Sequence, residues 1–273
     1  MPSSTKATEA RHSKPVQVLG RVGMACYGVV HLIIAYLAIR IVASGGGQEA
    51  DGRGAITEIG STGFGGFLLW VVAVGLIAYG LWQALMAING YQWIDKERRR
   101  TMKRVASAAR CVMGISLGVY AIQLAAGSGS QGGSGDQQQQ EFTAKLLALP
   151  AGPFLVGVLA VVVLGVAVSS AAKGIRKTFL DDLDFSSLPS GSRRWVERLG
   201  RVGYLAKSVV FGVVGVLIGY AAFTHDPGQA GGLDAALRTL ADQPFGPVLL
   251  IAVAAGFAAF GAYCFGAAWA HRK

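Results

Sequence analysis

The sequence predicts an all-helical integral membrane protein in which six transmembrane helices form three parallel helix pairs with pseudo-threefold symmetry. Three observations predict this fold. The string Leu-Gly-Arg-Val-Gly occurs at 19–23 and again at 199–203, and each copy opens a long apolar stretch. Of the 273 residues, 52% are hydrophobic and only 15% are charged, whereas soluble domains contain about 25% charged residues. Lysine and arginine gather on one side of the apolar stretches, as is typical of membrane proteins.

Six stretches are long and apolar enough to cross a membrane, since a helix needs about 20 such residues to span roughly 30 Å of hydrocarbon. They cover residues 22–42, 64–88, 105–126, 152–172, 202–223 and 247–270. Backbone groups in lipid must be hydrogen-bonded internally, which favours helices at this length. Apolar residues recur at about helical spacing in 55–59 and 233–240. We therefore expect a short amphipathic helix in each of these two outer connections.

The apolar stretches pair into three copies of one unit, at residues 21–90, 104–175 and 199–270. The first helices of the copies align without gaps, and two sets of aligned positions stand out. These are Arg21, Arg104 and Arg201 at the helix start, and Tyr27, Arg110 and Lys207 further into the helix. Each copy is therefore a hairpin of two membrane-spanning helices.

Positive charge orients the hairpins. All but four of the 25 lysine and arginine residues lie on one side of the apolar stretches, and the four on the other side are Arg40, Arg53, Lys145 and Arg238. Because lysine and arginine are enriched on the cytoplasmic side, both termini are predicted to be cytoplasmic in a multi-pass protein of the plasma membrane. All three hairpins then have the same orientation, so the repeats are parallel and not inverted.

Two polar segments lie outside the apolar stretches, one before the first repeat and one within the second. Residues 1–20 are predicted to form a cytoplasmic tail, which we expect to be retained because no A-x-A-like cleavage site follows the first apolar run. Residues 127–140 read GSGSQGGSGDQQQQ, a low-complexity composition that cannot bury a core. We expect this outer loop to be disordered.

The third copy carries Leu-Gly-Arg-Val-Gly-Tyr at 199–204, Gly-Leu-Asp-Ala-Ala-Leu-Arg at 232–238 and Gln-Pro-Phe-Gly-Pro at 243–247. Through these segments, and over almost its whole length, the chain resembles the bacterial membrane-protein family of domain of unknown function 1206, which is common in actinobacteria. The resemblance implies three tandem helix pairs and brings no established activity, ligand or catalytic residue. The middle copy departs most, because it has no counterpart of Leu-Asp-Ala-Ala-Leu.

His31 is a candidate functional residue, because an ionisable side chain near the middle of an apolar stretch is uncommon. It could relay a proton or coordinate a ligand. However, the aligned positions hold Gly114 and Phe211, and the apolar stretches contain no second histidine to form a haem pair. A neutral histidine held by an interhelical hydrogen bond is therefore the favoured interpretation.

Three further groups of residues are candidates for packing or binding. Small residues allow helices to approach closely, and those expected to mediate helix packing are Ala35, Gly118, Gly165, Gly215 and Gly261. The basic run Arg98, Arg99 and Arg100 could hold anionic lipid headgroups, although any loop on the positive side has this composition. The carboxylates of Asp181, Asp182 and Asp184 could bind a divalent cation, but pairing with nearby arginines is favoured.

Signatures of catalysis are absent from the sequence. It contains no phosphate-binding glycine loop, no H-E-x-x-H pair and no G-x-S-x-G turn, and its acidic residues fall outside the apolar stretches. We therefore expect a non-enzymatic structural or accessory protein without metal or cofactor. Its expected partners are membrane lipids and a membrane protein or a second copy, not nucleic acid. A small-solute transporter or channel is an alternative that requires a polar cavity on the pseudo-threefold axis. A lipid-acting enzyme is another.

Overall fold

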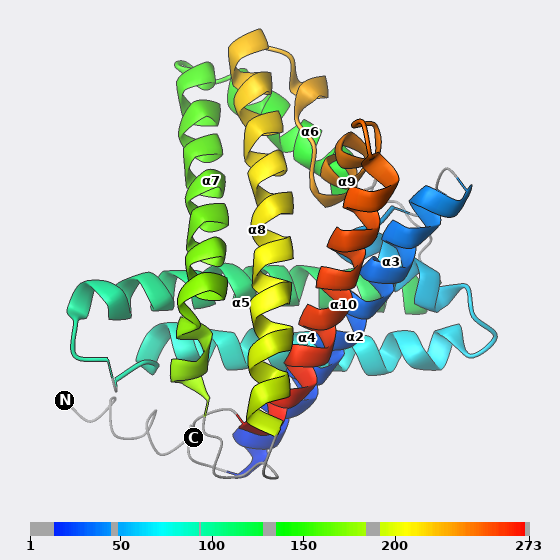
Figure 1. Cartoon of the computed structure of the whole chain (residues 1–273). Helices are drawn as coiled ribbons and strands as arrows, with labels where there is room; N and C mark the ends of the chain where they lie inside the picture. The colour runs from blue at the N-terminus through cyan, green and yellow to red at the C-terminus, as the bar shows by residue number, and fades with distance from the viewer. Residues whose placement is uncertain (1–13, 45–48, 93, 128–134, 184–191, 271–273) are drawn as a thin grey trace.

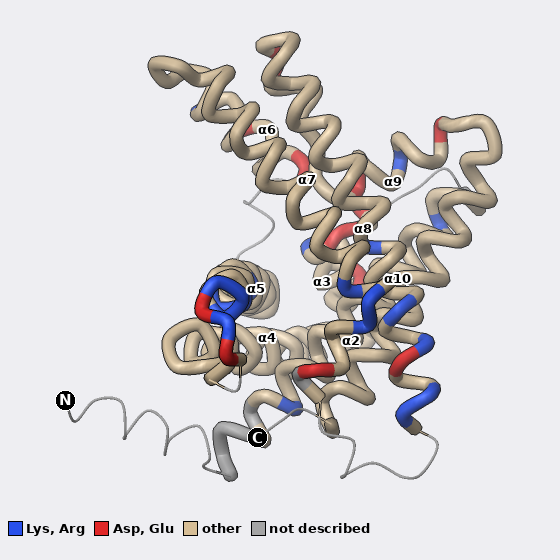
Figure 2. The backbone as a smooth tube through the Cα atoms, turned by 60° about the vertical axis from the view of Figure 1, so that its left-hand side comes forward, with Lys and Arg blue, Asp and Glu red and all other residues tan. Residues whose placement is uncertain are grey.

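A computed structural model of the chain describes residues 14–44, 49–92, 94–127, 135–183 and 192–270 (Figure 1). The described residues form helices joined by short connections and contain no β-strand. Six long helices are α2 (Lys14–Ser44), α4 (Gly65–Asn89), α5 (Glu97–Ala125), α7 (Gly152–Arg176), α8 (Ser192–Thr224) and α10 (Gly246–Ala270). Each is long and apolar enough to cross a membrane, which confirms the six predicted spans. Figure 2 shows charged residues gathered in short segments, as at the start of α5, between long uncharged lengths of helix.

Short helices occupy the outer connections. They are α3 (Gly52–Gly60), α6 (Gly135–Leu147) and α9 (Leu233–Ala241), with the 3-10 turn η3 (Pro227–Gln229). The 3-10 turn η1 (Thr178–Asp182) lies instead in the inner connection between α7 and α8. The amphipathic helices expected at 55–59 and 233–240 are thus present as α3 and α9. Both bury apolar side chains, among them Ile56 and Leu237, each fully buried. Burial of this apolar face holds each short helix against the bundle.

The long helices pack in an order that follows the repeats. The second helix of each repeat lies along the first helix of the next, which gives the pairs α4 with α5, α7 with α8, and α10 with α2. Contacts within a repeat are also extensive for α2 with α4 and for α8 with α10. By contrast, α5 and α7 make at most isolated contacts across their described residues. In Figure 1, α4 and α5 run across the direction of α7 and α8. The six helices therefore form a ring that is open inside the second repeat.

The outer helices give a physical reason for this opening. In the first repeat α3 packs on both α2 and α4, and in the third repeat α9 packs on both α8 and α10. Each short helix therefore clamps the two long helices of its own repeat together. In the second repeat, α6 packs on α7 but has no comparable contact with α5 among the described residues. Without that clamp, α5 stays with α4 and α7 stays with α8.

Small residues determine how closely several helices approach. A Cβ atom added at Gly118 would lie 2.6 Å from Ile77 Cγ1 of α4, and one at Gly215 would lie 2.7 Å from Leu164 of α7. At Gly261 it would lie 2.8 Å from the carbonyl oxygen of Gly28 in α2. Ala35 of α2 is buried. At these positions a larger side chain would force the helices apart.

Gly165 does not act in this way. It is exposed on α7, and apart from its own helix backbone and chain neighbours no described atom lies within 4 Å of the position that its Cβ would take. The prediction that Gly165 mediates helix packing is therefore wrong. The residues aligned with Gly165 in the other repeats are Ala78 of α4 and Ala259 of α10, two helices that pack inside the bundle. By contrast, α7 is peripheral, since less than a third of its span is buried. Gly165 on this peripheral helix therefore faces outward.

Two predicted polar segments are partly helical. Residues 14–20 belong to α2, so the tail ends earlier than expected, and residues 1–13 lie outside the described residues. Pro15 is compatible with this helix start because the first turn leaves its amide groups unpaired in any case. Of the loop predicted to be disordered, residues 135–140 form the first turns of α6. That helix start is held by a hydrogen bond from Gly135 N to Glu49 Oε2, at 3.0 Å.

Candidate functional site

A cluster of basic and aromatic side chains lies between the long helices, with Lys207 of α8 near its centre. The Lys207 ammonium donates a hydrogen bond to Tyr27 Oη at 3.2 Å and lies 3.3 Å from His31 Nε2. It also lies 4.0 Å from the centre of the Phe260 ring, in the range of a cation–π interaction. Lys207 is therefore held by residues of α2 and α10 across the bundle.

His31 orients this lysine. Its Nδ1 lies 2.9 Å from the carbonyl oxygen of Tyr27. A carbonyl can only accept, so Nδ1 must carry the hydrogen, and Nε2 is left as an acceptor for the Lys207 ammonium. The interhelical hydrogen bond expected for His31 is present, and its partner is Lys207. His31 is only 5% exposed, which makes it a positioning residue in this arrangement.

Two more cations approach Lys207. Arg110 of α5 and Lys173 of α7 both interact electrostatically with it. We call Arg110, Lys173 and Lys207 the basic cluster. Among the described residues, no carboxylate forms an ion pair with Arg110 or Lys207. Positive charge from three helices therefore converges without an acidic partner for two of its members.

Aromatic rings line the basic cluster. Arg110 interacts electrostatically with four tyrosines: Tyr27, Tyr79, Tyr91 and Tyr204. The rings of Tyr27 and Tyr79 stack with centres 4.8 Å apart, and Lys173 Nζ lies 5.9 Å from the centre of the Tyr204 ring. Ring faces and hydroxyl oxygens attract cations without neutralising them. The lining thus stabilises the basic cluster but leaves its net charge in place.

The repeats explain why this site exists. Tyr27, Arg110 and Lys207 occupy aligned positions in the three first helices, and the approximate symmetry brings them together. Lys207 follows Arg201 by six residues, which at 1.5 Å per residue is about 9 Å along the helix. The positive-inside rule counts Arg110 and Lys207 with the basic residues that flank the membrane. The site cannot be recognised from that count. The alignment of Arg110 and Lys207 with Tyr27 is the sequence signal that could have found it.

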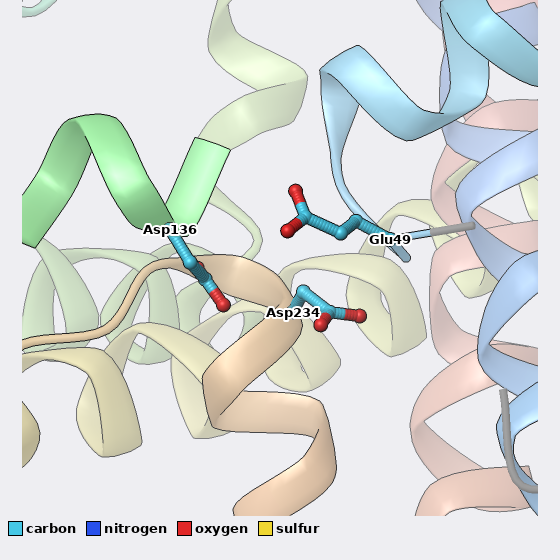
Figure 3. A group of neighbouring side chains, drawn as sticks. All are labelled: Glu49, Asp136 and Asp234. Atoms are coloured by element: carbon cyan, nitrogen blue, oxygen red, sulfur yellow. The ribbon is translucent and has the colours of Figure 1, made fainter. Parts of the chain in front are cut away.

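A second cluster, of carboxylates, lies among the outer connections (Figure 3). One oxygen each of Glu49, Asp136 and Asp234 lie within 4.8 Å of one another, and each repeat contributes one of these residues. Ligand spacing of this kind could accept a divalent cation. The carboxylates are, however, already bound by protein donors. Asp136 accepts from Gly232 N and Ala235 N, Asp234 accepts from Ala50 N and Arg238 Nε, and Glu49 accepts from Gly135 N, all at 2.6–3.0 Å. These bonds tie the three outer connections together and account for the cluster without an ion.

Asp51 lies beside this cluster and caps α3, where its carboxylate accepts a hydrogen bond from Gly54 N at 2.7 Å. Burial raises the pKa of Asp51 to about 6, and the charges of Glu49, Asp136 and Asp234 add to the effect. Burial also raises the pKa of Asp136. The outer connections thus hold more negative charge than their hydrogen bonds fully compensate.

The structure also places the other candidate residues. Arg99 Nη2 donates to Asp181 Oδ2 at 2.7 Å, so the expected pairing of this aspartate with an arginine occurs, across repeats. Arg100 donates to the carbonyl oxygen of Ile94, whereas Arg98 is exposed. The side chain of Asp182 and all of Asp184 lie outside the described residues. Two of the three arginines proposed to contact lipid therefore also bind protein atoms, and their contact with lipid stays a prediction.

Comparisons with known proteins agree with the repeat structure. The chain is similar to the uncharacterized protein YxxB of Bacillus subtilis (strain 168), with 29% identity over 254 residues that cover 93% of this chain and 90% of the relative. No solved structure matches the chain. The family model described as Domain of Unknown Function (DUF1206) matches three times, at residues 22–90, 105–177 and 202–271, which together make up well over half of the sequence. The chain therefore belongs to the DUF1206 family, as three tandem copies of its domain.

Proposed function

We propose that this chain is a non-enzymatic accessory protein of the plasma membrane, with both termini in the cytoplasm, that engages membrane lipid through the opening between α5 and α7. One observation carries the proposal: these two helices belong to the same repeat and yet do not pack along each other over their described residues. The other two repeats show what a closed helix pair looks like in this fold.

The surfaces beside the opening support lipid as the occupant. Side chains such as Val112 of α5 and Val168 of α7 are more than two-thirds exposed. In a bilayer such apolar side chains contact acyl chains, because lipid tails are as apolar as the side chains themselves. The two helices that flank the opening thus carry exposed apolar side chains that can contact the tails of a lipid.

Site-specific photocrosslinking in native membranes tests this function. A photoreactive amino acid is placed at Val112 or Val168, and a matched control is placed at Val74 of α4, which is 62% exposed. We expect a higher yield of covalent lipid adducts at Val112 and Val168 than at the control position Val74. Equal lipid labelling at all three positions, or labelling by one protein at Val112 and Val168, would contradict the proposal.

The basic cluster favours a second function, transport of an anionic solute. A transporter needs a polar site in the membrane that its substrate can reach. Proteoliposomes that contain the purified chain would then take up a small anion such as phosphate faster than protein-free liposomes. Equal uptake by both kinds of vesicle would reject transport of that anion and leave the accessory function standing.

A further inference from the structure

The basic cluster concentrates positive charge among buried aromatic side chains such as Tyr27 and Phe260, where little water can solvate it. Two of its members, Arg110 and Lys207, have no carboxylate partner among the described residues, and Arg110 and Lys173 both repel Lys207. Separating charges from water costs several kcal/mol per ion unless a counter-charge is near. A bound anion would supply that counter-charge and convert the repulsion into attraction.

We propose that the basic cluster binds the phosphate group of an anionic lipid headgroup from the inner leaflet, which enters between α5 and α7. The proposal rests on the lipid engagement proposed above and names the chemistry that is recognised. Arginine and lysine both bind phosphate, arginine through its planar fork of N–H donors and lysine as a compact charge. The two types occur here side by side.

Donor groups remain available for such a ligand. The Lys207 ammonium has three N–H donors, and two of them face Tyr27 Oη and His31 Nε2. None of the described residues accepts a third hydrogen bond from Lys207, which otherwise faces the Phe260 ring, so one donor remains for a phosphate oxygen. Arg110 makes no ion pair with a described carboxylate, and its guanidinium offers further donors. Tyr27 and His31 act as positioning residues, since they fix the lysine without neutralising it.

The route favours a lipid over a dissolved anion. Arg110 and Lys173 belong to α5 and α7, the two helices that leave the ring open. Lys173 lies near the last turn of α7, close to the basic end of that helix. A headgroup at the inner membrane surface is thus near the depth of the basic cluster, and its acyl chains can lie against the exposed apolar side chains of the same two helices.

The test measures lipid binding by the full-length purified chain. Native mass spectrometry compares retention of phosphatidylglycerol with that of phosphatidylcholine of the same acyl chains. We expect the wild type to retain phosphatidylglycerol preferentially. In Arg110→Gln and Lys207→Gln the apparent affinity for phosphatidylglycerol should fall by about 10- to 150-fold, which corresponds to the loss of one charged hydrogen bond of about 1.5–3 kcal/mol. Lys207→Arg keeps the charge and should bind within about threefold of wild type.

Arg98→Gln is the matched control, because it removes one positive charge from the exposed rim near the start of α5. It should change the affinity less than about twofold, as expected for a screened surface charge. If Arg98→Gln weakens binding as much as Lys207→Gln does, the preference reflects the overall charge of the inner face, and the proposal is overturned. Equal retention of the two lipids by the wild type also overturns it.

Inorganic phosphate distinguishes the two sources of the same chemistry. If a large excess of inorganic phosphate leaves phosphatidylglycerol bound, a lipid headgroup is the ligand. If inorganic phosphate binds with the same dependence on Lys207 and displaces the lipid, the lipid assignment is overturned. A photoactivatable phosphatidylglycerol added to the wild type gives a readout that needs no variant, since it should label peptides of α5 and α7. Labelling of those peptides by photoactivatable phosphatidylcholine alone would sustain lipid engagement but reject headgroup recognition.

Discussion

Protonation of Asp51 should strengthen the outer face of the molecule, and its substitution by asparagine should have the same effect at neutral pH. Asp51 is 9% exposed, and its pKa is raised from the usual 3.8 to about 6. The folded state therefore binds a proton more tightly than the unfolded state. Stability is highest when Asp51 is protonated and falls as the pH rises from about 4 to about 6. Above about pH 6 the free energy of unfolding does not depend further on the ionisation of Asp51.

The size of this effect follows from the two pKa values. At 1.36 kcal/mol per pKa unit, the interval from 3.8 to about 6 corresponds to about 3 kcal/mol, or about 150-fold in a local opening equilibrium. This figure is an upper bound, because Asp136 shares the repulsion and its pKa is raised as well. In Asp51→Asn the amide oxygen can still accept from Gly54 N, since asparagine is as good an N-cap as aspartate. The substitution thus removes charge and keeps the cap.

Hydrogen exchange of the backbone amides in α3 measures the effect locally, after correction for the intrinsic pH dependence of exchange. Wild-type protection should increase on going from pH 7.5 to pH 5, and Asp51→Asn should show the higher protection at both values. Asp242→Asn, at an exposed carboxylate next to α9, is the control and should leave α3 unchanged. Protection in α3 that is the same at both pH values in the wild type, or lower in Asp51→Asn than in the wild type at pH 7.5, would refute the reasoning.

Three further predictions concern topology and packing. In a background without native cysteines, single cysteines at Arg53 and Arg99 should be labelled from opposite sides of the membrane by an impermeant thiol reagent, and labelling from one side only would contradict the orientation. Gly118→Leu should destabilise the bundle by about 1–3 kcal/mol through overpacking against α4, whereas Gly165→Leu should change stability by less than about 0.5 kcal/mol, as thermal unfolding in detergent would show. Thr143→Val should stabilise α6 by about 1–3 kcal/mol, measured by hydrogen exchange, because it removes a buried hydroxyl that has no hydrogen-bond partner.

Length and apolar composition were sufficient to predict the six membrane helices and the two short amphipathic helices. Periodicity and span length act along the chain, so they can be seen in the sequence. The segment 135–140 was misjudged because its helix depends on a distant partner. Gly135 is held by Glu49 of another repeat, and no property of GSGSQGGSGDQQQQ itself reveals that bond.

The candidate site was predictable only in part, for a similar reason. His31 stands out because it is polar in an apolar run, whereas Arg110 and Lys207 resemble ordinary positive flanks of a membrane helix. Their distinction from such flanks is spatial: they reach toward Tyr27 and other tyrosines in the interior. For Gly165 the sequence predicted a contact that the structure lacks, because a small residue promotes helix packing only where a neighbouring helix lies against it.

The opening in the second repeat can be traced to one position in the outer helices. Ile56, Thr143 and Leu237 each lie nine residues before the glycine that begins the second long helix of their repeat, and all three are fully buried. Isoleucine and leucine supply apolar area to a clamp across two helices, but threonine supplies less and leaves its hydroxyl without a partner. The middle copy thus lacks the buried isoleucine or leucine at this position. It also lacks the Leu-Asp-Ala-Ala-Leu segment, which ends at Leu237 in the third copy. Because the same repeat also carries Arg110 and Lys173, the weakened clamp opens the ring beside the two cations that a ligand from the bilayer would meet first.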